Sequence, residues 1–139
     1  EHVSELQHEL AEDIMRSVGT AIWLDEEIKL DAVTALSGSG PAYFFLIMEV
    51  MEKAAIKLGL DEAQARQLTL ESAFGAAKMA REQNHEPGVL RKQVSSPGGT
   101  TEKALQVLIE GGIEDLFAAA LNAANNRSIE LANEFGSST

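Results

Sequence analysis

The stretch Pro41-Ala42-Tyr43-Phe44-Phe45-Leu46-Ile47-Met48 decides the fold, because it opens a helix that has no polar side. Pro41 suits the first turn of a helix, where its missing N–H has no partner to lose. The same helix is expected to continue to about Leu58. A helix that is apolar all round is buried on all sides. The sequence therefore predicts a helical core that other helices, or a second chain, must cover.

The remainder of the chain after Asp25 also reads as helix, which makes the fold class all-α. Ser37-Gly38-Ser39-Gly40 is expected to break the chain between two helices. Asp61 and Gln64 form a capping-box pattern at the start of one of the later helices. The expected helices besides the one at Pro41 are Glu26–Leu36, Glu62–Gln83, a short turn at Val89–Gln93, Thr100–Glu110 and Ile113–Glu134.

The N-terminal part differs, because it combines a helix with a strand-like run. A helix is expected over Ser4–Ser17, where Ser4 and Gln7 form another capping-box pattern. Thr20-Ala21-Ile22-Trp23-Leu24 is short, apolar and partly β-branched, which predicts a buried strand with Trp23 in a core. One strand cannot form a sheet. We therefore expect this strand to pair with another molecule or to fray, and its usual partners to belong to a missing domain.

Composition excludes several classes of function. The 139 residues suit one domain, and the net charge of −11 makes a nucleic-acid partner unexpected. Cysteine is absent and the three histidines are scattered, so no disulfide and no metal site is expected; a cytoplasmic location fits. Neither a signal peptide nor a membrane-spanning run of 18 apolar residues is recognisable. The large apolar helical surface instead favours a homodimer with a shared core.

The segment Val94-Ser95-Ser96-Pro97-Gly98-Gly99-Thr100-Thr101 is the best candidate for a binding site. Its paired glycines let the backbone approach a ligand closely, and they precede a predicted helix, whose free N–H groups attract anions. The serine and threonine hydroxyls add donors and acceptors. These features suit a small carboxylate. The same residues also fit a plain Pro-Gly turn followed by a threonine helix cap, and spacing alone leaves both interpretations open.

Ser37-Gly38-Ser39-Gly40-Pro41 is the second candidate, because its small residues ahead of a helix could face an anion or a cofactor. It is not a dinucleotide fingerprint, since the element before it is predicted to be helical and no G-x-G-x-x-G follows a strand. A tight turn between helices explains the same residues. Tyr43 could donate a proton, but its apolar surroundings favour a core residue with a satisfied hydroxyl.

At these two segments the sequence resembles the pyrroline-5-carboxylate reductases. One matching phrase is similar to the opening of that family's long central helix, and another looks like its signature region. The resemblance extends from about Ile14 to Leu131. The matching phrases, in chain order, are Asp31-Ala32-Val33-Thr34-Ala35-Leu36, Leu36-Ser37-Gly38-Ser39-Gly40-Pro41-Ala42-Tyr43, Gly75-Ala76-Ala77-Lys78, Val94-Ser95-Ser96-Pro97-Gly98-Gly99-Thr100-Thr101, Ala104-Leu105 and Glu110-Gly111-Gly112.

The resemblance implies a reaction and a site. In this family a hydride passes from NADPH or NADH to the C=N carbon of L-1-pyrroline-5-carboxylate, giving L-proline in proline biosynthesis. Carried onto this chain, Thr101 is the catalytic residue and hydrogen-bonds the ring nitrogen. Ser96 and the backbone N–H groups of Gly99 and Thr100 hold the carboxylate, and Val94 packs near the ring. The full set of substrate-binding residues implied is Val94, Ser96, Gly98, Gly99, Thr100 and Thr101.

The resemblance also implies a fold and its parts: an interwoven helical dimerisation domain of the 6-phosphogluconate-dehydrogenase C-terminal-like type. Residues 1–24 would match the last helix and strand of the family's Rossmann domain, which explains the orphan strand. Residues 25–136 would form the helical substrate-binding and dimerisation domain, and 137–139 a tail. Because the family's cofactor sits in the Rossmann half, no cofactor is expected to bind this chain alone, and its reductase activity is expected to be negligible. The expected assembly is a homodimer or a larger oligomer of dimers, without a membrane partner.

Other classes of function stay open at this stage. A non-catalytic dimerisation module would have no need of a polar cradle, and Thr101→Ala would then cost only stability. The helical domain of a hydroxyacid or ketopantoate-type dehydrogenase would place a catalytic lysine on an interior helix, where Lys78 is the candidate. A helical regulator is a further alternative, and the acidic charge argues against DNA as its target.

Overall fold

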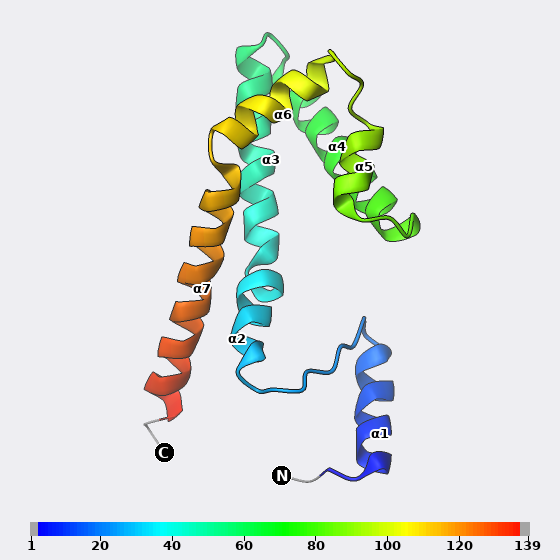
Figure 1. Cartoon of the computed structure of the whole chain (residues 1–139), viewed down its shortest axis with the longest axis vertical. Helices are drawn as coiled ribbons and strands as arrows, with labels where there is room; N and C mark the ends of the chain where they lie inside the picture. Colours follow the sequence, from blue (N-terminus) through cyan, green and yellow to red (C-terminus); the bar gives the residue numbers. More distant parts are fainter. Residues whose placement is uncertain (1–2, 137–139) are drawn as a thin grey trace. The chain divides into compact units, whose positions relative to one another are not determined.

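A computed structural model describes residues 3–136, and the chain divides into two compact units between Leu30 and Asp31. Each unit is described by itself. The described residues form helices and connecting turns without any strand, so the all-α prediction is confirmed. Figure 1 shows the helices in chain order, with the labels used below.

The N-terminal unit contains α1 (Glu5–Arg16) and the irregular segment that follows it. The predicted capping box is present, since Ser4 and Gln7 exchange hydrogen bonds between side chain and backbone. After the turn, Trp23 stacks on His8 with ring centroids 3.6 Å apart, and its indole N–H donates to Glu12 at 3.0 Å. This clasp holds the segment against α1.

Two predictions for this segment are wrong. Thr20–Leu24 forms no strand, because nothing in the described part of the chain offers a neighbouring strand to hydrogen-bond with it. Trp23 does not lie in a core: it is 52% exposed, and Ile22 beside it is 80% exposed. One 12-residue helix cannot enclose an indole, so the unit provides only the stack on His8 and the hydrogen bond to Glu12.

The chain enters the second unit through one helical stretch. The break expected at Ser37–Gly40 is reduced to a bend at Ser39, and Pro41 lies in the first turn of the helix that follows, as predicted. Helix α2 (Lys29–Val33) passes into the π-helical turn η1 (Thr34–Gly38) and then into α3 (Gly40–Lys57). Pro41 lacks an N–H, and in a regular helix its ring would collide with the carbonyl four residues earlier. The wider π turn just before it relieves that conflict without ending the helix. Its signature is the Ser39 N–H, which donates to the Thr34 carbonyl at 2.9 Å.

Helix α4 (Glu62–Glu82) packs against α3 and supplies much of the buried core of this unit. The predicted cap is present, since Asp61 and Gln64 form a complete capping box. Ala65 and Thr69, one helical turn apart, are both buried. The short helix α5 (Pro87–Gln93) follows and begins two residues earlier than the turn expected from Val89.

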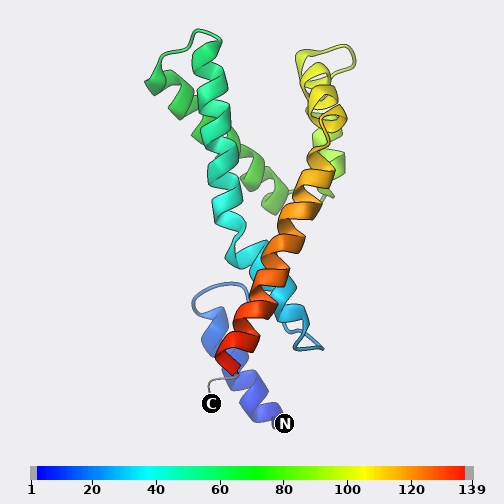
Figure 2. The same cartoon turned by 90° about the vertical axis from the view of Figure 1, so that its left-hand side faces the viewer.

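The last two helices, α6 (Thr100–Glu110) and α7 (Ile113–Gly136), pack against each other, and α7 also packs against η1. Figure 2 shows α3 with α4 and α6 with α7 as two arms of this unit that diverge from the region of η1. The Ser128 hydroxyl on α7 donates to Asp31 on α2 at 2.7 Å and ties the end of the unit to its beginning.

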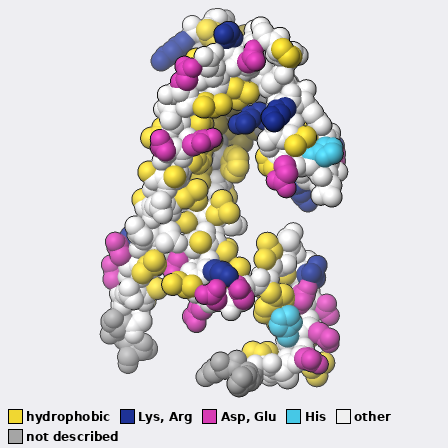
Figure 3. All heavy atoms as spheres, viewed as in Figure 1, with side chains coloured by type: hydrophobic (Ala, Val, Ile, Leu, Met, Phe, Trp, Pro, Cys, Tyr) yellow, Lys and Arg dark blue, Asp and Glu magenta, His cyan; other side chains and the backbone are white. Residues whose placement is uncertain are grey.

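A single chain leaves most of its apolar side chains in solvent. Phe44, Phe45 and Leu46, expected to be buried on all sides, are each at least 60% exposed. Apolar side chains gather along α3 and α7 in Figure 3. Side chains of both helices line a groove of 440 Å³. Burial of this helix therefore needs partners that one chain does not supply.

One helical stretch of the described chain, Lys29–Lys57, is long and apolar enough to cross a membrane by length and composition alone. A core helix of a globular protein passes the same test. The stretch contains the π turn and the phrase around Pro41 that the sequence assigns to a shared helical core, and the core interpretation explains its composition.

Candidate functional site

The candidate loop lies between α5 and α6, and its first residues complete α5. The Val94 N–H donates to the Leu90 carbonyl, and the Ser95 N–H donates to Lys92, each at 3.2 Å. The Ser95 hydroxyl turns back to the Arg91 carbonyl at 2.6 Å. Ser95 therefore completes the end of α5, whereas the Ser96 hydroxyl makes no hydrogen bond to the described residues.

A tight turn at Ser96–Gly99 gives the loop its shape. The Gly99 N–H donates to the Ser96 carbonyl at 3.0 Å, and Gly98 has a φ of 72° between them. This is the arrangement of a type II turn with proline second and glycine third. A side chain at Gly99 would also meet the Ser96 carbonyl oxygen at 3.0 Å. Both glycines thus have a local structural reason, as the turn interpretation predicts.

Helix α6 begins directly after this turn, with Gly99 as its N-cap and no side chain capping it. The threonine cap considered from the sequence is therefore not formed. The N–H groups of Thr100 and Thr101 belong to the first turn and have no acceptor within the helix. They lie at the positive end of the helix dipole, which favours an anion. The loop thus combines a turn with amides that are free for a ligand.

The structure brings the six expected site residues together on one exposed loop. Ser96, Gly98, Thr100 and Thr101 are exposed, and Val94 is 58% exposed. A hollow of 550 Å³ lies beside the loop, but its lining comes from Ser95 and from one side of α6. The polar groups of the candidate site therefore face open surface in a single chain.

Sequence reasoning missed one residue of this site. Glu102, in the first turn of α6, accepts a hydrogen bond from the Gly98 N–H through Oε2 at 2.7 Å. A glutamate three residues after a helix cap is a recognisable signal, because such side chains fold back onto the backbone before the helix.

The second candidate, Ser37-Gly38-Ser39-Gly40, does not form a ligand cradle. It lies within the π turn and the start of α3; the Ser39 N–H is bonded within the helix, and Gly40 is buried. Tyr43 is partly buried, and its hydroxyl donates to the Ala35 carbonyl at 3.0 Å, as expected for a core residue with a satisfied hydroxyl. These residues shape the bend between η1 and α3.

The described residues do not fit a dinucleotide cofactor. Pyrophosphate binding of the Rossmann type needs a glycine-rich turn between a strand and a helix. Residues 3–136 contain no strand, and the glycine–serine run sits inside a continuous helix. No step of the chemistry is therefore assigned to a cofactor held by this part of the protein.

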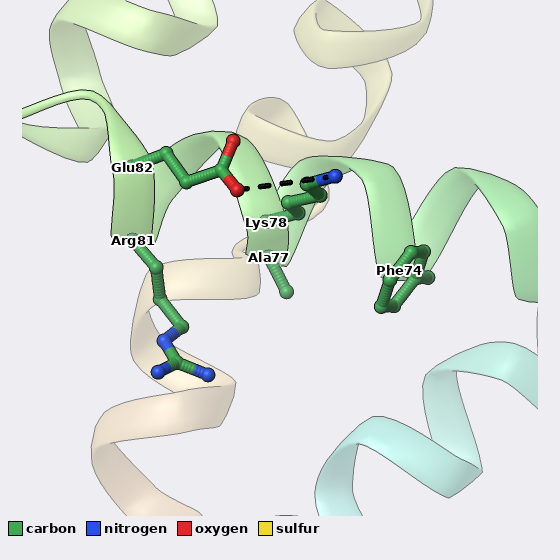
Figure 4. Close-up of a pocket in the computed structure, with 5 residues that line it drawn as sticks. All are labelled: Phe74, Ala77, Lys78, Arg81 and Glu82. Atoms are coloured by element: carbon green, nitrogen blue, oxygen red, sulfur yellow. Dashed lines mark ion pairs between the residues drawn. The ribbon is translucent and has the colours of Figure 1, made fainter.

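Lys78, the candidate lysine of the dehydrogenase alternative, lies on an exposed side of α4. Figure 4 shows a dashed line joining Lys78 to Glu82, with Arg81 directed to another side of the helix and Phe74 one turn away. The Lys78 ammonium and the Glu82 carboxylate are 3.9 Å apart, and both side chains are more than half exposed. An exposed pair of this kind contributes little energy. The open pocket of 470 Å³ around it offers no buried setting for a catalytic lysine.

Comparisons with known proteins agree with the resemblance. The family model described as "Pyrroline-5-carboxylate reductase dimerisation" matches residues 27–131. A curated pyrroline-5-carboxylate reductase of Pseudomonas aeruginosa is 52% identical over 134 residues, which cover 96% of this chain and 49% of the relative. One from Haemophilus influenzae is 42% identical over 96% of this chain and 50% of its own length. The chain thus spans about half the length of the curated relatives it matches.

Solved structures give the same result. A pyrroline-5-carboxylate reductase from Coxiella burnetii superposes with a TM-score of 0.89 at 50% identity, covering 93% of this chain and 48% of that one. The Plasmodium falciparum pyrroline carboxylate reductase, solved with NADP bound, superposes with a TM-score of 0.80 at 29% identity. The match covers 92% of this chain and 48% of that one. The matched region of these relatives is their C-terminal half. The chain therefore belongs to the pyrroline-5-carboxylate reductase family, in the region of its dimerisation domain.

Proposed function

We propose that this chain supplies the substrate-binding and dimerisation part of an enzyme that reduces L-1-pyrroline-5-carboxylate to L-proline with NADPH or NADH. The observation that carries the proposal is the loop from Val94 to Thr101. It presents free first-turn amides and hydroxyls together at the positive end of α6. It also lies within the residues that match the family model.

Each residue has a role that suits a cyclic imino acid with one carboxylate. The Thr101 hydroxyl hydrogen-bonds the ring nitrogen. Ser96 and the N–H groups of Gly99 and Thr100 hold the carboxylate, with the Gly99 proton shared with the Ser96 carbonyl of its turn. Val94 covers the ring, and Gly98 allows the turn. Binding of this kind acts by positioning and by stabilising charge.

The same proposal assigns the parts of the chain. Residues 1–24 are the remnant of a nucleotide-binding domain, 25–136 form the helical domain, and 137–139 are a tail outside the described residues. The cofactor belongs to the nucleotide-binding half, so this chain alone binds none and turns over no substrate. A homodimer, alone or within a larger ring, covers the exposed apolar helices. The protein works in the cytoplasm.

A reductase assay tests the proposal. NADPH oxidation with pyrroline-5-carboxylate is measured for this chain alone and for the chain joined to the N-terminal half of the Pseudomonas aeruginosa relative, which is 52% identical over the shared region. We expect turnover only in the joined protein. Thr101→Ala should lower its kcat/KM by about 10²-fold, the usual effect of losing a positioned donor.

The matched control is Ser72→Ala on the exposed side of α4, which removes a hydroxyl far from the loop in sequence and should leave kcat/KM unchanged. Full activity of the joined Thr101→Ala protein would show that the loop is not the substrate site. A joined protein that dimerises and binds NADPH but reduces no pyrroline-5-carboxylate would favour a non-catalytic dimerisation module.

A further inference from the structure

We infer that Glu102 is a positioning residue for the substrate loop, an inference that rests on the proposed function. Its carboxylate folds back over the first turn of α6, and Oε2 accepts the Gly98 N–H at 2.7 Å. In a capping box, a glutamate at this place bonds to the N–H of the cap residue itself. Here the cap is Gly99, and Glu102 reaches one residue further, into the turn.

This bond holds a backbone conformation that would otherwise be costly to keep. Gly98 has a φ of 72°. In a free loop, a glycine would also populate several other backbone conformations. The Gly99 N–H is bonded to the Ser96 carbonyl, and the Gly98 N–H is bonded to Glu102. Because both glycine amides are hydrogen-bonded, the turn keeps one conformation. That conformation fixes the direction of the Thr101 amide and hydroxyl.

Glu102 acts on the ligand through the loop and not by contact. A carboxylate side chain would repel the carboxylate of an imino acid, so direct binding by Glu102 is unfavourable. Glu102 therefore supports the loop through its hydrogen-bond acceptor atom and not through its charge. Glutamine at this position keeps an acceptor of the same length without the charge, whereas alanine removes the acceptor.

Backbone amide NMR of the 139-residue chain tests the inference, with L-proline as the probe. Without ligand, the Gly98 amide of Glu102→Ala should shift and exchange with solvent faster, while Glu102→Gln keeps it near its original position. With ligand, Glu102→Ala should weaken proline binding by about two- to five-fold, in keeping with the loss of one exposed cap. Glu102→Gln should bind at least as tightly as the original chain.

The matched control is Glu114→Ala, which removes the same charge from the first turn of α7. It should change neither the Gly98 amide signal nor the affinity for proline. An unchanged Gly98 amide in Glu102→Ala, or proline binding as tight as in the original chain, would overturn the inference; tighter binding would mean that Glu102 competes with the ligand. If the original chain binds no proline, a preformed substrate site in this chain is refuted, and the Gly98 amide still decides whether Glu102 fixes the loop.

Discussion

Ser128 and Asp31 are 97 residues apart in sequence, and the Ser128 hydroxyl donates to the Asp31 carboxylate at 2.7 Å. The bond is partly buried and joins α7 to α2. Ser128→Ala should therefore lower the free energy of unfolding by about 1 kcal/mol, the net contribution of a typical hydrogen bond. Chemical unfolding, monitored by the helical circular dichroism signal, measures this change in the free energy of unfolding. Ser72→Ala, on an exposed helical surface, calibrates the gain in helix propensity from alanine; equal stability of the two variants would show that the bond contributes nothing.

Gly98 and Gly88 provide a matched pair of glycines. A side chain would find open space at both, but Gly98 has a φ of 72° and Gly88 lies inside α5. Gly98→Ala should cost about 1–2 kcal/mol of stability because of the left-handed backbone. Gly88→Ala should raise the stability by about 0.4–1 kcal/mol. Thermal unfolding of the two variants makes the comparison. A Gly98→Ala chain as stable as Gly88→Ala would mean that the turn relaxes freely.

Acid should release the clasp of the N-terminal unit. The hydrogen bond from Arg16, and after it the one from the Trp23 indole, hold the pKa of Glu12 below its ordinary value of 4.5. A carboxyl whose pKa is lowered by folding stabilises the fold above 4.5 and loses that contribution as pH falls through the lower, folded pKa. We therefore expect the clasp to open only below pH 4.5.

Trp23 is the single tryptophan, so its fluorescence reports the clasp directly. The emission should shift on acidification below pH 4.5, and Glu12→Ala should show the shifted emission already at neutral pH. A His8→Phe background keeps a ring in the stack and removes the imidazole from the comparison. Identical emission of the Glu12→Ala and original chains at neutral pH would contradict the clasp.

The groove between α3 and α7 should be covered in a dimer. Leu116 lines it and is 67% exposed in the single chain. Leu116→Glu should shift the chain toward monomer and lower its helical melting temperature, because a charge would have to be buried in an apolar interface. Sedimentation velocity measures the assembly. Leu6→Glu, at an exposed position on α1, is the control; a dimer that survives Leu116→Glu unchanged would place the interface elsewhere.

Local rules predicted the parts of the fold that depend on a few neighbouring residues. The capping boxes at Ser4 and Asp61 formed because their bonds span three residues. The strand at Thr20–Leu24 needed a partner that no nearby sequence reveals. Ser37-Gly38-Ser39-Gly40 was expected to break the chain, but a π turn that ends at Gly38 leads through a bend at Ser39 into α3, whose first turn contains Pro41.

The candidate loop was located by its glycines and hydroxyls, yet its internal bonds were not predictable from them. The hydroxyls of Ser95 and Ser96 look equivalent in the sequence, and only the geometry shows that Ser95 completes α5. Glu102 lies one residue beyond the segment Val94–Thr101, although its spacing from Gly98 allows the bond. Such assignments depend on backbone direction at the turn, which residue types alone do not fix.

A titration of the chain with L-proline, followed by backbone amide NMR, tests the central claim most directly. The account predicts shifts centred on Ser96 to Thr101 that are lost in Thr101→Ala, because the loop at the start of α6 is the substrate half-site. Shifts confined to other segments, or none at tens of millimolar proline in a chain that is folded and dimeric, would contradict a preformed site in this part of the enzyme.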